Sequence, residues 1–198
     1  MHVIKQYSKT ITIEKSKFIC YICPCKTEEE YKEYLLFFRK KYFDADHICS
    51  ALICNNIKKS SDAGEPSGTA GIPMLNVLEK RNIDDVCAIV IRYFGGIKLG
   101  SNGLIRAYSD SVNECLDLCE LYEYETLDKY ELTFTYESSS KIEHLLLSNT
   151  YVFAKEYDVN IKYTFGIKDP DIYNQLLSLT KGQKPIYIGR VDIDKVVK

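Results

Sequence analysis

The stretch DVCAIVIRYFGGIKLGSNGLIRAY, residues 85–108, contains in turn a strand pattern, a glycine-rich turn and a helix pattern. Its first part is a continuous apolar run rich in β-branched residues, which is typical of a strand buried on both faces. After the glycines, Ser101 is a candidate N-cap for a helix whose core positions recur at helical spacing from Leu104 to Cys119. We therefore expect a buried strand that leads through a tight turn into a helix, in a mixed α/β fold.

The turn and the helix start combine four glycines with three cationic side chains. Glycines let the backbone approach a ligand or adopt positive φ, and the free N–H groups of a helix start attract anions, above all phosphate. The candidate ligand-binding or anion-binding residues are Arg92, Tyr93, Gly95, Gly96, Lys98, Gly100, Ser101, Gly103 and Arg106. The spacing resembles a phosphate-binding loop, but Ser101 and Asn102 replace its Lys and Ser or Thr. A structural strand-to-helix turn with solvated cations is the alternative.

The segment before this strand, KKSSDAGEPSGTAG at residues 58–71, is rich in Ser, Gly and Pro and is predicted to be a loop. The two carboxylates of Asp62 and Glu65 and the two hydroxyls of Ser67 and Thr69 are enough to bind a cation or to polarise water. The candidate residues are Asp62, Gly64, Glu65, Ser67, Gly68 and Thr69, with His47 as a candidate base. In the alternative interpretation, Ser and Thr close turns and cap a helix near Ile72, Glu65 pairs with an arginine, and His47 is structural.

Length and composition indicate a globular chain. With 198 residues, of which 45% are hydrophobic and 27% charged, it can bury the core of one large or two small domains. The net charge of −2 excludes a globally basic surface, so a site for a polyanion must be a local patch. No run approaches the roughly 18 apolar residues of a membrane span, and the first residues do not form a signal-peptide core. We expect a cytoplasmic protein with no membrane association.

The eight cysteines are expected to be reduced, because no export signal is apparent, and to serve mostly as small buried hydrophobes. Cys20, Cys23 and Cys25 come closest to a metal-binding cluster. However, Cys20 and Cys23 fall on opposite faces of a predicted strand, and no second Cys-x-x-Cys follows. The sequence therefore predicts no metal site and no cofactor.

The order of predicted strands and helices divides the chain into two units. In the first, strands are predicted over residues 7–18, 18–25 and 47–57, and helices over 27–42 and 72–81. The segment LYEYETLDKY, residues 121–130, is acidic and aromatic, and the boundary is expected near residue 128. This gives units 1–128 and 129–198.

The second unit has the strand and helix order β-α-β-β-α-β, which is the ferredoxin-like order. Strands are predicted over residues 130–136, 151–157, 160–167 and 184–193, and helices over 138–149 and 171–181.

Two long motifs and several short ones resemble the signature of the IMPACT/YigZ family. Both long motifs occur in the expected order and spacing, and they cover the first unit. They are Asp62 with GEPSGTAG at residues 64–71, and RYFGGIKLG at 92–100 with GLIRAY at 103–108; KSKF at 15–18 and the Ala45, His47, Cys49 and Ala51 pattern also fit. Two positions depart from the pattern: Ala63 replaces a second Asp, which removes one carboxylate, and Asn102 replaces a Gly.

The resemblance implies an N-terminal domain similar to domain 2 of a small-subunit ribosomal protein, a fold also found in elongation factor G and small-molecule kinases. The ferredoxin-like unit resembles the last domain of elongation factor G. The eukaryotic relative is a translational regulator that restrains the starvation-response kinase by competing for its activator protein. These likenesses point toward RNA or the ribosome.

Three hypotheses follow for the function. The first is a non-enzymatic regulator that binds RNA, the ribosome or a translation-factor partner through residues 62–71 and 92–108. The second is an enzyme that acts on a phosphorylated or nucleotide-like small molecule, with Asp62 and Glu65 as acid, base or magnesium ligand. The third is a protein-interaction module whose partner site lies elsewhere. The first is favoured.

Overall fold

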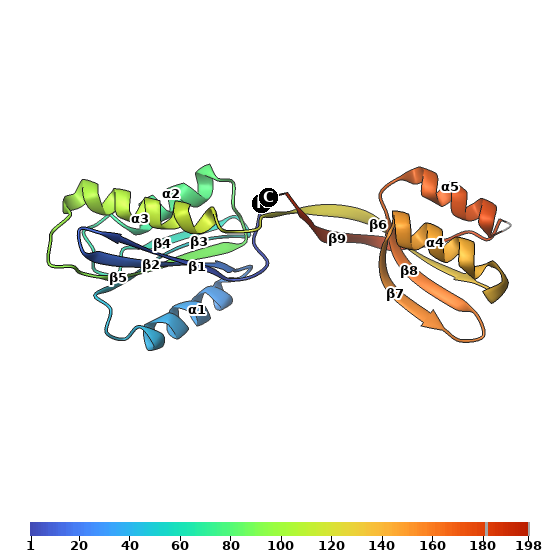
Figure 1. Ribbon diagram of the computed structural model, residues 1–198, viewed down its shortest axis with the longest axis horizontal. Helices are drawn as coiled ribbons and strands as arrows, with labels where there is room; N and C mark the ends of the chain where they lie inside the picture. The colour runs from blue at the N-terminus through green and yellow to red at the C-terminus, as the bar shows by residue number, and fades with distance from the viewer. Residues whose placement is uncertain (181, 198) are drawn as a thin grey trace. The chain divides into compact units, whose positions relative to one another are not determined.

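The computed structural model describes residues 1–180 and 182–197 and divides into two compact units (Figure 1). Unit 1 contains Met1–Glu123 together with Val196 and Val197, and unit 2 contains Tyr124–Lys195. The division falls inside strand β6 (Tyr122–Phe134), whereas the change in composition indicates a boundary near residue 128. Because a strand runs through the division, no Gly- or Pro-rich linker marks it in the sequence.

Unit 1 is a five-stranded antiparallel sheet in the order β1-β2-β5-β3-β4. Helix α1 covers one face of the sheet, and helices α2 and α3 cover the other (Figure 1). The strands are β1 (Tyr7–Ile13), β2 (Ser16–Pro24), β3 (His47–Cys54), β4 (Ile57–Ser61) and β5 (Val86–Tyr93); the helices are α1 (Glu28–Lys41), α2 (Gly71–Lys80) and α3 (Gly100–Leu116).

The central strand β5 is buried on both faces, as its apolar run predicts. Val86, Ala88 and Val90 pack into the core beneath α2 and α3, and the residues between them pack beneath α1. Since side chains alternate along a strand, Arg92 lies on the same face as Val90. Its side chain therefore enters the covered face of the sheet near the end of the strand, where the residue is only 5% exposed.

Several local predictions were wrong. The strand predicted over residues 47–57 ends at Cys54, and the strand predicted over residues 7–18 is broken by a turn at Glu14 and Lys15, which have positive φ. Residues 58–61 belong to strand β4 rather than to a loop, because an Asn55-Asn56 turn with both residues at positive φ folds them back onto β3. Every residue of β4 is exposed, so no apolar alternation indicates the strand. Ser101 does not cap α3, which begins at Gly100 after Leu99 and has no side-chain cap.

Other local predictions were confirmed. Thr27 caps α1 by accepting a hydrogen bond from the backbone N–H of Glu30. All eight cysteines are buried, as expected for small hydrophobes, and Cys20 packs on the opposite face of the sheet from Cys23. The mixed α/β class is also confirmed.

Unit 2 has the predicted β-α-β-β-α-β order, with a sheet ordered β7-β8-β6-β9. Helices α4 and α5 lie on one face of this sheet (Figure 1) and share its apolar core. After β6 come a 3-10 turn (Tyr136–Ser138), α4 (Ser139–Asn149), β7 (Tyr151–Tyr157), β8 (Ile161–Ile167), α5 (Pro170–Leu179) and β9 (Ile186–Val196). The end predicted for α5, Lys181, lies outside the described residues.

Within residues 1–180 and 182–197, no helix has the length and apolar character that crossing a membrane requires.

Candidate functional site

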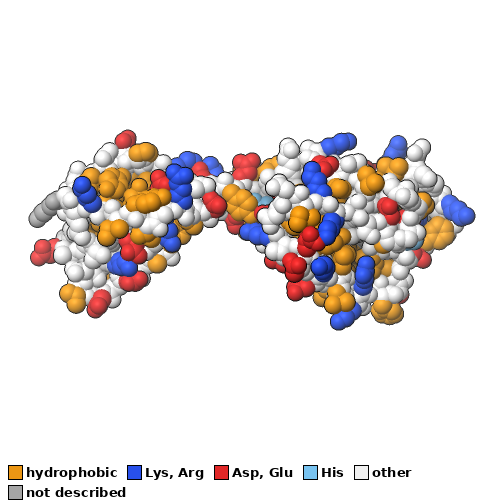
Figure 2. Space-filling view, turned by 180° about the vertical axis from the view of Figure 1, so that it is seen from behind, with side chains coloured by type: hydrophobic (Ala, Val, Ile, Leu, Met, Phe, Trp, Pro, Cys, Tyr) orange, Lys and Arg blue, Asp and Glu red, His pale blue; other side chains and the backbone are white. Residues whose placement is uncertain are grey.

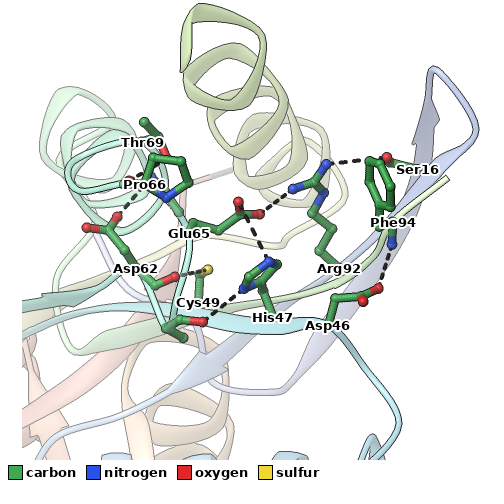
Figure 3. A network of polar contacts seen from close by, with 12 residues as sticks. Ser16, Asp46, His47, Cys49, Asp62, Glu65, Pro66, Thr69, Arg92 and Phe94 are labelled. Atoms are coloured by element: carbon green, nitrogen blue, oxygen red, sulfur yellow. Dashed lines mark hydrogen bonds and ion pairs between the residues drawn. The ribbon is translucent and has the colours of Figure 1, made fainter. Parts of the chain in front are cut away.

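A buried ion pair joins the loop of residues 62–71 to the end of β5 (Figure 3). Arg92 Nη1 donates to Glu65 Oε1 at 2.6 Å, and the two side chains are only 6% and 3% exposed. The Tyr108 hydroxyl, from α3, donates to the same carboxylate oxygen at 2.8 Å. The alternative in which Glu65 pairs with an arginine is thus the arrangement in the structure, and Arg92 is not a freely exposed cation.

Aromatic rings and a serine hold the other side of the Arg92 guanidinium (Figure 3). Its Cζ lies 5.4 Å from the ring centroid of Phe18 and 5.6 Å from that of Phe94. Nη2 donates to Ser16 Oγ at 3.5 Å. The buried Arg92 Nε has no hydrogen-bond partner in the part of the chain that the structure describes. One donor of this guanidinium is therefore left unsatisfied.

Strand β3 contributes two neighbours of the ion pair. His47 lies opposite Arg92 in the register of β3 and β5, and its Nδ1 lies 3.0 Å from the carbonyl oxygen of Ala63. Since a carbonyl only accepts, Nδ1 carries the proton, and Nε2 faces Glu65 Oε2 at 3.8 Å. Cys49 Sγ donates to the Asp62 carbonyl at 2.9 Å and contacts the Tyr108 hydroxyl at 3.3 Å.

The thiol and the phenol of this network stay protonated. Burial raises the pKa of Cys49 to about 12, and burial likewise raises the pKa of Tyr108 far above its ordinary value. A thiol in this state is a poor nucleophile, because the thiolate is the reactive form. The arrangement therefore favours a structural role for Cys49.

Asp62 organises the loop that presents Glu65. Its Oδ2 accepts from the N–H of Gly68 at 2.8 Å, and its Oδ1 accepts from Ala70 and Gly71 at 3.0 and 2.8 Å. These bonds satisfy backbone donors at the start of α2, so Asp62, and not Ser or Thr, caps this helix. They also occupy most acceptor positions of the carboxylate, which leaves little capacity for a metal ion. Thr69 closes a turn by donating to the Pro66 carbonyl at 2.7 Å.

The stability of unit 1 is expected to depend on the charge of Asp62. Burial opposes ionisation of this carboxyl, but the three backbone donors outweigh it and lower its pKa. A lowered folded-state pKa stabilises the fold above the unfolded value of about 3.9, and this stabilisation is lost as the pH falls through the folded value. Asp62→Asn should therefore cost about 2 kcal/mol near neutral pH, and the difference from wild type should shrink below about pH 4. Urea unfolding between pH 2 and 7 tests this; a difference that does not change with pH would contradict it.

The glycines of the turn serve different purposes. A Cβ on Gly95 would lie 2.0 Å from the backbone carbon of Lys15, so this glycine permits close contact with the β1–β2 turn and not with a ligand. Gly96 and Gly100 have positive φ of 86° and 70°, with open space around them. A Cβ on Gly103 would lie 3.0 Å from Leu99 Cβ. The expectation that these glycines admit a ligand is thus wrong for Gly95.

The first turn of α3 opens into a cavity of about 480 Å³, named here the α3 cavity. Lys98 and Ser101 are exposed at it, whereas Glu65 and Arg92 are buried beside it. Asp46 also lines it, with its Oδ2 accepting from the Phe94 N–H at 2.7 Å. The full lining is Asp46, His47, Glu65, Pro66, Arg92, Phe94, Lys98, Leu99, Gly100, Ser101 and Leu104.

Several candidate residues lie outside this cavity. Arg106 and Gly103 line a neighbouring hollow with Asn102, and Lys98 borders both. Tyr93 donates to Asp44 at 2.8 Å. Ser67 is exposed on the loop, Gly64 lies against His47, and Gly68 faces α2 and α3 in a third hollow.

Sequence reasoning missed four residues of the network and its surroundings. Tyr108 was assigned only to the helix core, although its hydroxyl needs a partner when buried. Ser16 and Phe18 belong to the KSKF motif and Asp46 lies within the pattern from Ala45 to Ala51, but both segments were used only as family signatures and not as site residues. The alternation of β3 and β5, continued to His47 and Arg92, is the signal that places these two side chains on the α2 and α3 face.

The fold and the motifs around this network define a class of mixed α/β proteins with an Impact N-terminal domain. The model of that domain family matches residues 14–116. The chain is 39% identical over 188 residues to the IMPACT family member YvyE of Bacillus subtilis (strain 168), covering 91% of this chain and 87% of that protein. The chain belongs to the IMPACT family, as the resemblance of its motifs indicated.

A second relative and one solved structure are also similar. The IMPACT family member YigZ of Escherichia coli (strain K12) is 37% identical over 139 residues, which are 68% of each chain. A crystal structure described as that of an hypothetical protein has 28% sequence identity and a TM-score of 0.61, and the match covers 94% of this chain and 95% of that chain.

Proposed function

We propose that this chain is a non-enzymatic, translation-related regulator that binds single-stranded RNA through the surface around the start of α3. One observation carries the proposal: Lys98 and Arg106 are exposed beside an uncapped helix start, next to a Phe94 that is 45% exposed. Free N–H groups and cations attract phosphates, and exposed aromatic rings stack on bases. Lys98, Arg106 and Phe94 are called the α3 surface below.

The charge distribution supports a local site for a polyanion. On the face drawn in Figure 2, basic and acidic side chains are interspersed, in keeping with the net charge of −2. Among the residues that the structure describes, no carboxylate lies within ion-pair distance of Lys98 or Arg106. Their positive charge is therefore available to a partner.

The contacts of the network favour binding over catalysis. Asp62 is occupied by backbone donors, Glu65 is paired with Arg92, and the Cys49 thiol is protonated. The relation of the family to a eukaryotic translational regulator supports the regulatory part of the proposal. The two carboxylates that the enzyme hypothesis assigns as acid, base or magnesium ligand are therefore already engaged.

Removing both cations of the α3 surface is expected to weaken RNA binding and its dependence on salt. For Lys98→Ala/Arg106→Ala, each lost phosphate contact should lower the slope of log affinity against log salt by about 0.7. Fluorescence anisotropy with a labelled single-stranded RNA, at several salt concentrations, measures both quantities. Both side chains are exposed, so folding should change little.

The matched control removes the same charge from α1, on the opposite face of the sheet. Lys32→Ala/Arg39→Ala changes one exposed lysine and one exposed arginine and should leave binding nearly unchanged. Failure of the wild type to bind RNA would overturn the proposal, as would an equal loss of affinity in the control.

A further inference from the structure

We infer that helix α1 is a self-association surface, on which a second copy of this chain packs its own α1 antiparallel to the first. The surface is the exposed side of the helix that carries Glu33, Leu36, Phe37 and Lys40, called the α1 stripe below. Helix α1 alone covers its face of the sheet (Figure 1), so its outer side is turned to solvent. Helix α3 covers the opposite face, so this inference goes beyond the proposed function and does not rest on it.

Two large apolar side chains are exposed at the middle of the α1 stripe. Leu36 and Phe37 are 56% and 53% exposed, and Phe43, just past the end of the helix, is 85% exposed. The helix packs on the sheet through a different side, with Tyr31 and Phe38 buried in the core. Exposed apolar residues that gather on one side of a helix are typical of an interaction surface. A contact between two copies would remove both apolar pairs from water.

The charges of α1 are divided between its two halves. Glu28, Glu29, Glu30 and Glu33 precede the apolar pair, with Lys32 as the one cation among them, and Arg39, Lys40 and Lys41 follow it. The helix dipole favours acidic residues in the first turn and basic residues in the last turn. It does not account for Glu33 in the second turn or for the exposed apolar pair. Neither Glu33 nor Lys40 has an ion-pair partner among the residues that the structure describes.

The α1 stripe is symmetric about its own centre. Glu33 lies three residues before Leu36, and Lys40 lies three residues after Phe37. At about 1.5 Å per residue, each charge is roughly 5 Å along the helix from the midpoint, and two turns bring both to nearly the same side. A two-fold axis at the midpoint therefore places Glu33 of each copy opposite Lys40 of the other, with the apolar pairs between them. A parallel arrangement would place like charges opposite each other, so the charges select the antiparallel one.

A hollow beside the stripe fits the same arrangement. It measures about 430 Å³ and is lined by Gln6, Glu30, Glu33, Tyr34 and Phe37. Its walls therefore combine two carboxylates with two aromatic rings. In the antiparallel pair, the basic end of the second helix lies over this acidic half of the first. The hollow thus offers opposite charge to the end of α1 that would meet it, and it does so twice because of the two-fold symmetry.

Sedimentation velocity of the full chain, at concentrations from about 1 to 200 μM, tests the inference. A contact through one helix from each copy is small among protein interfaces, so we expect a reversible dimer with a dissociation constant in the micromolar range. Leu36→Gln/Phe37→Gln should weaken the dimer at least about tenfold, because the apolar contact is lost. All substituted side chains are exposed, and circular dichroism verifies the fold. A wild type that stays monomeric throughout would overturn the inference.

Reversing one charge at a time tests the antiparallel pairing. Glu33→Lys and Lys40→Glu each place like charges opposite each other twice, so each variant alone should dimerise at least about tenfold more weakly. An equimolar mixture of the two variants should dimerise again, because opposite charges then meet at both positions. A mixture that stays as monomeric as its components would contradict the pairing.

The matched control is Arg39→Glu, which makes the same reversal of charge one residue earlier. Arg39 lies one turn after the half-buried Leu35, on the flank of α1 and not on the stripe. Dimerisation should therefore remain nearly as in the wild type. An equal loss in Arg39→Glu and Lys40→Glu would overturn the inference, and so would a dimer that persists in every variant, because another surface would then hold it together.

Discussion

Glu65→Ala is expected to lower the free energy of unfolding of unit 1 by about 3–5 kcal/mol, since it leaves the buried guanidinium of Arg92 without its counter-charge. Both side chains are more than nine-tenths buried, so water cannot replace the lost carboxylate readily. The Tyr108 hydroxyl loses its acceptor in the same variant. A change of this size is a large part of the stability of an ordinary domain.

Hydrogen exchange of the β5 amides in increasing urea measures this change in unit 1 alone. The matched control is Glu120→Ala, which breaks an ion pair with Lys5 at 3.1 Å whose side chains are 52% and 59% exposed. That pair should be worth less than about 1 kcal/mol. Equal effects of the two substitutions would show that the Glu65 and Arg92 pair is not shielded from water.

A double variant distinguishes the charge from the packing. In Glu65→Leu/Arg92→Met, no charge remains buried, and much of the stability lost in Glu65→Ala should return. If the double variant is as unstable as Glu65→Ala, the hydrogen bonds to Tyr108 and Ser16 matter more than the charge balance. The double variant also leaves Lys98 and Arg106 in place, so its RNA affinity reports whether the ion pair only supports the α3 surface.

The fold of unit 1 around β5 could be predicted because its signals are local. A continuous apolar run, glycines and a helical stripe follow one another within residues 85–108, and each indicates its own element. Strand β4 has no such signal, since its residues are all exposed and its pairing depends on the Asn55-Asn56 turn. The start of α3 was predicted wrongly because Ser101 looks like an N-cap in the sequence, whereas the helix begins at Gly100 and no side chain caps it.

The candidate site was harder to predict because its chemistry depends on partners distant in sequence. Arg92 and Lys98 look alike as cations in a glycine-rich stretch, yet one is buried against Glu65 and the other is exposed. Asp62 looks like a free carboxylate until the loop folds and places three N–H groups around it. The pairing of Glu65 with an arginine was foreseen as an alternative, but sequence alone does not identify which arginine.

Gly95→Ala is expected to destabilise unit 1 by about 3 kcal/mol or more, because the new Cβ would overlap the backbone of the β1–β2 turn. The built Cβ lies 2.0 Å from the carbon and 2.3 Å from the oxygen of Lys15, and backbone atoms cannot rotate away as a side chain can. The turn would have to move, which also breaks the bond from the Gly95 N–H to Ser16 Oγ at 3.1 Å. Thermal unfolding and hydrogen exchange of the β2 and β5 amides measure the loss.

The adjacent glycine supplies the control, since Gly96 has open space around it and only its positive φ resists a side chain. Gly96→Asn should therefore cost no more than about 1 kcal/mol, because asparagine tolerates the left-handed region. Displacement of Ser16 in Gly95→Ala also removes a contact of Arg92, which Gly96→Asn should keep. A Gly95→Ala protein as stable as Gly96→Asn would mean that the β1–β2 turn does not lie against the glycine turn, and the position of Arg92 beneath α3 would then need another support.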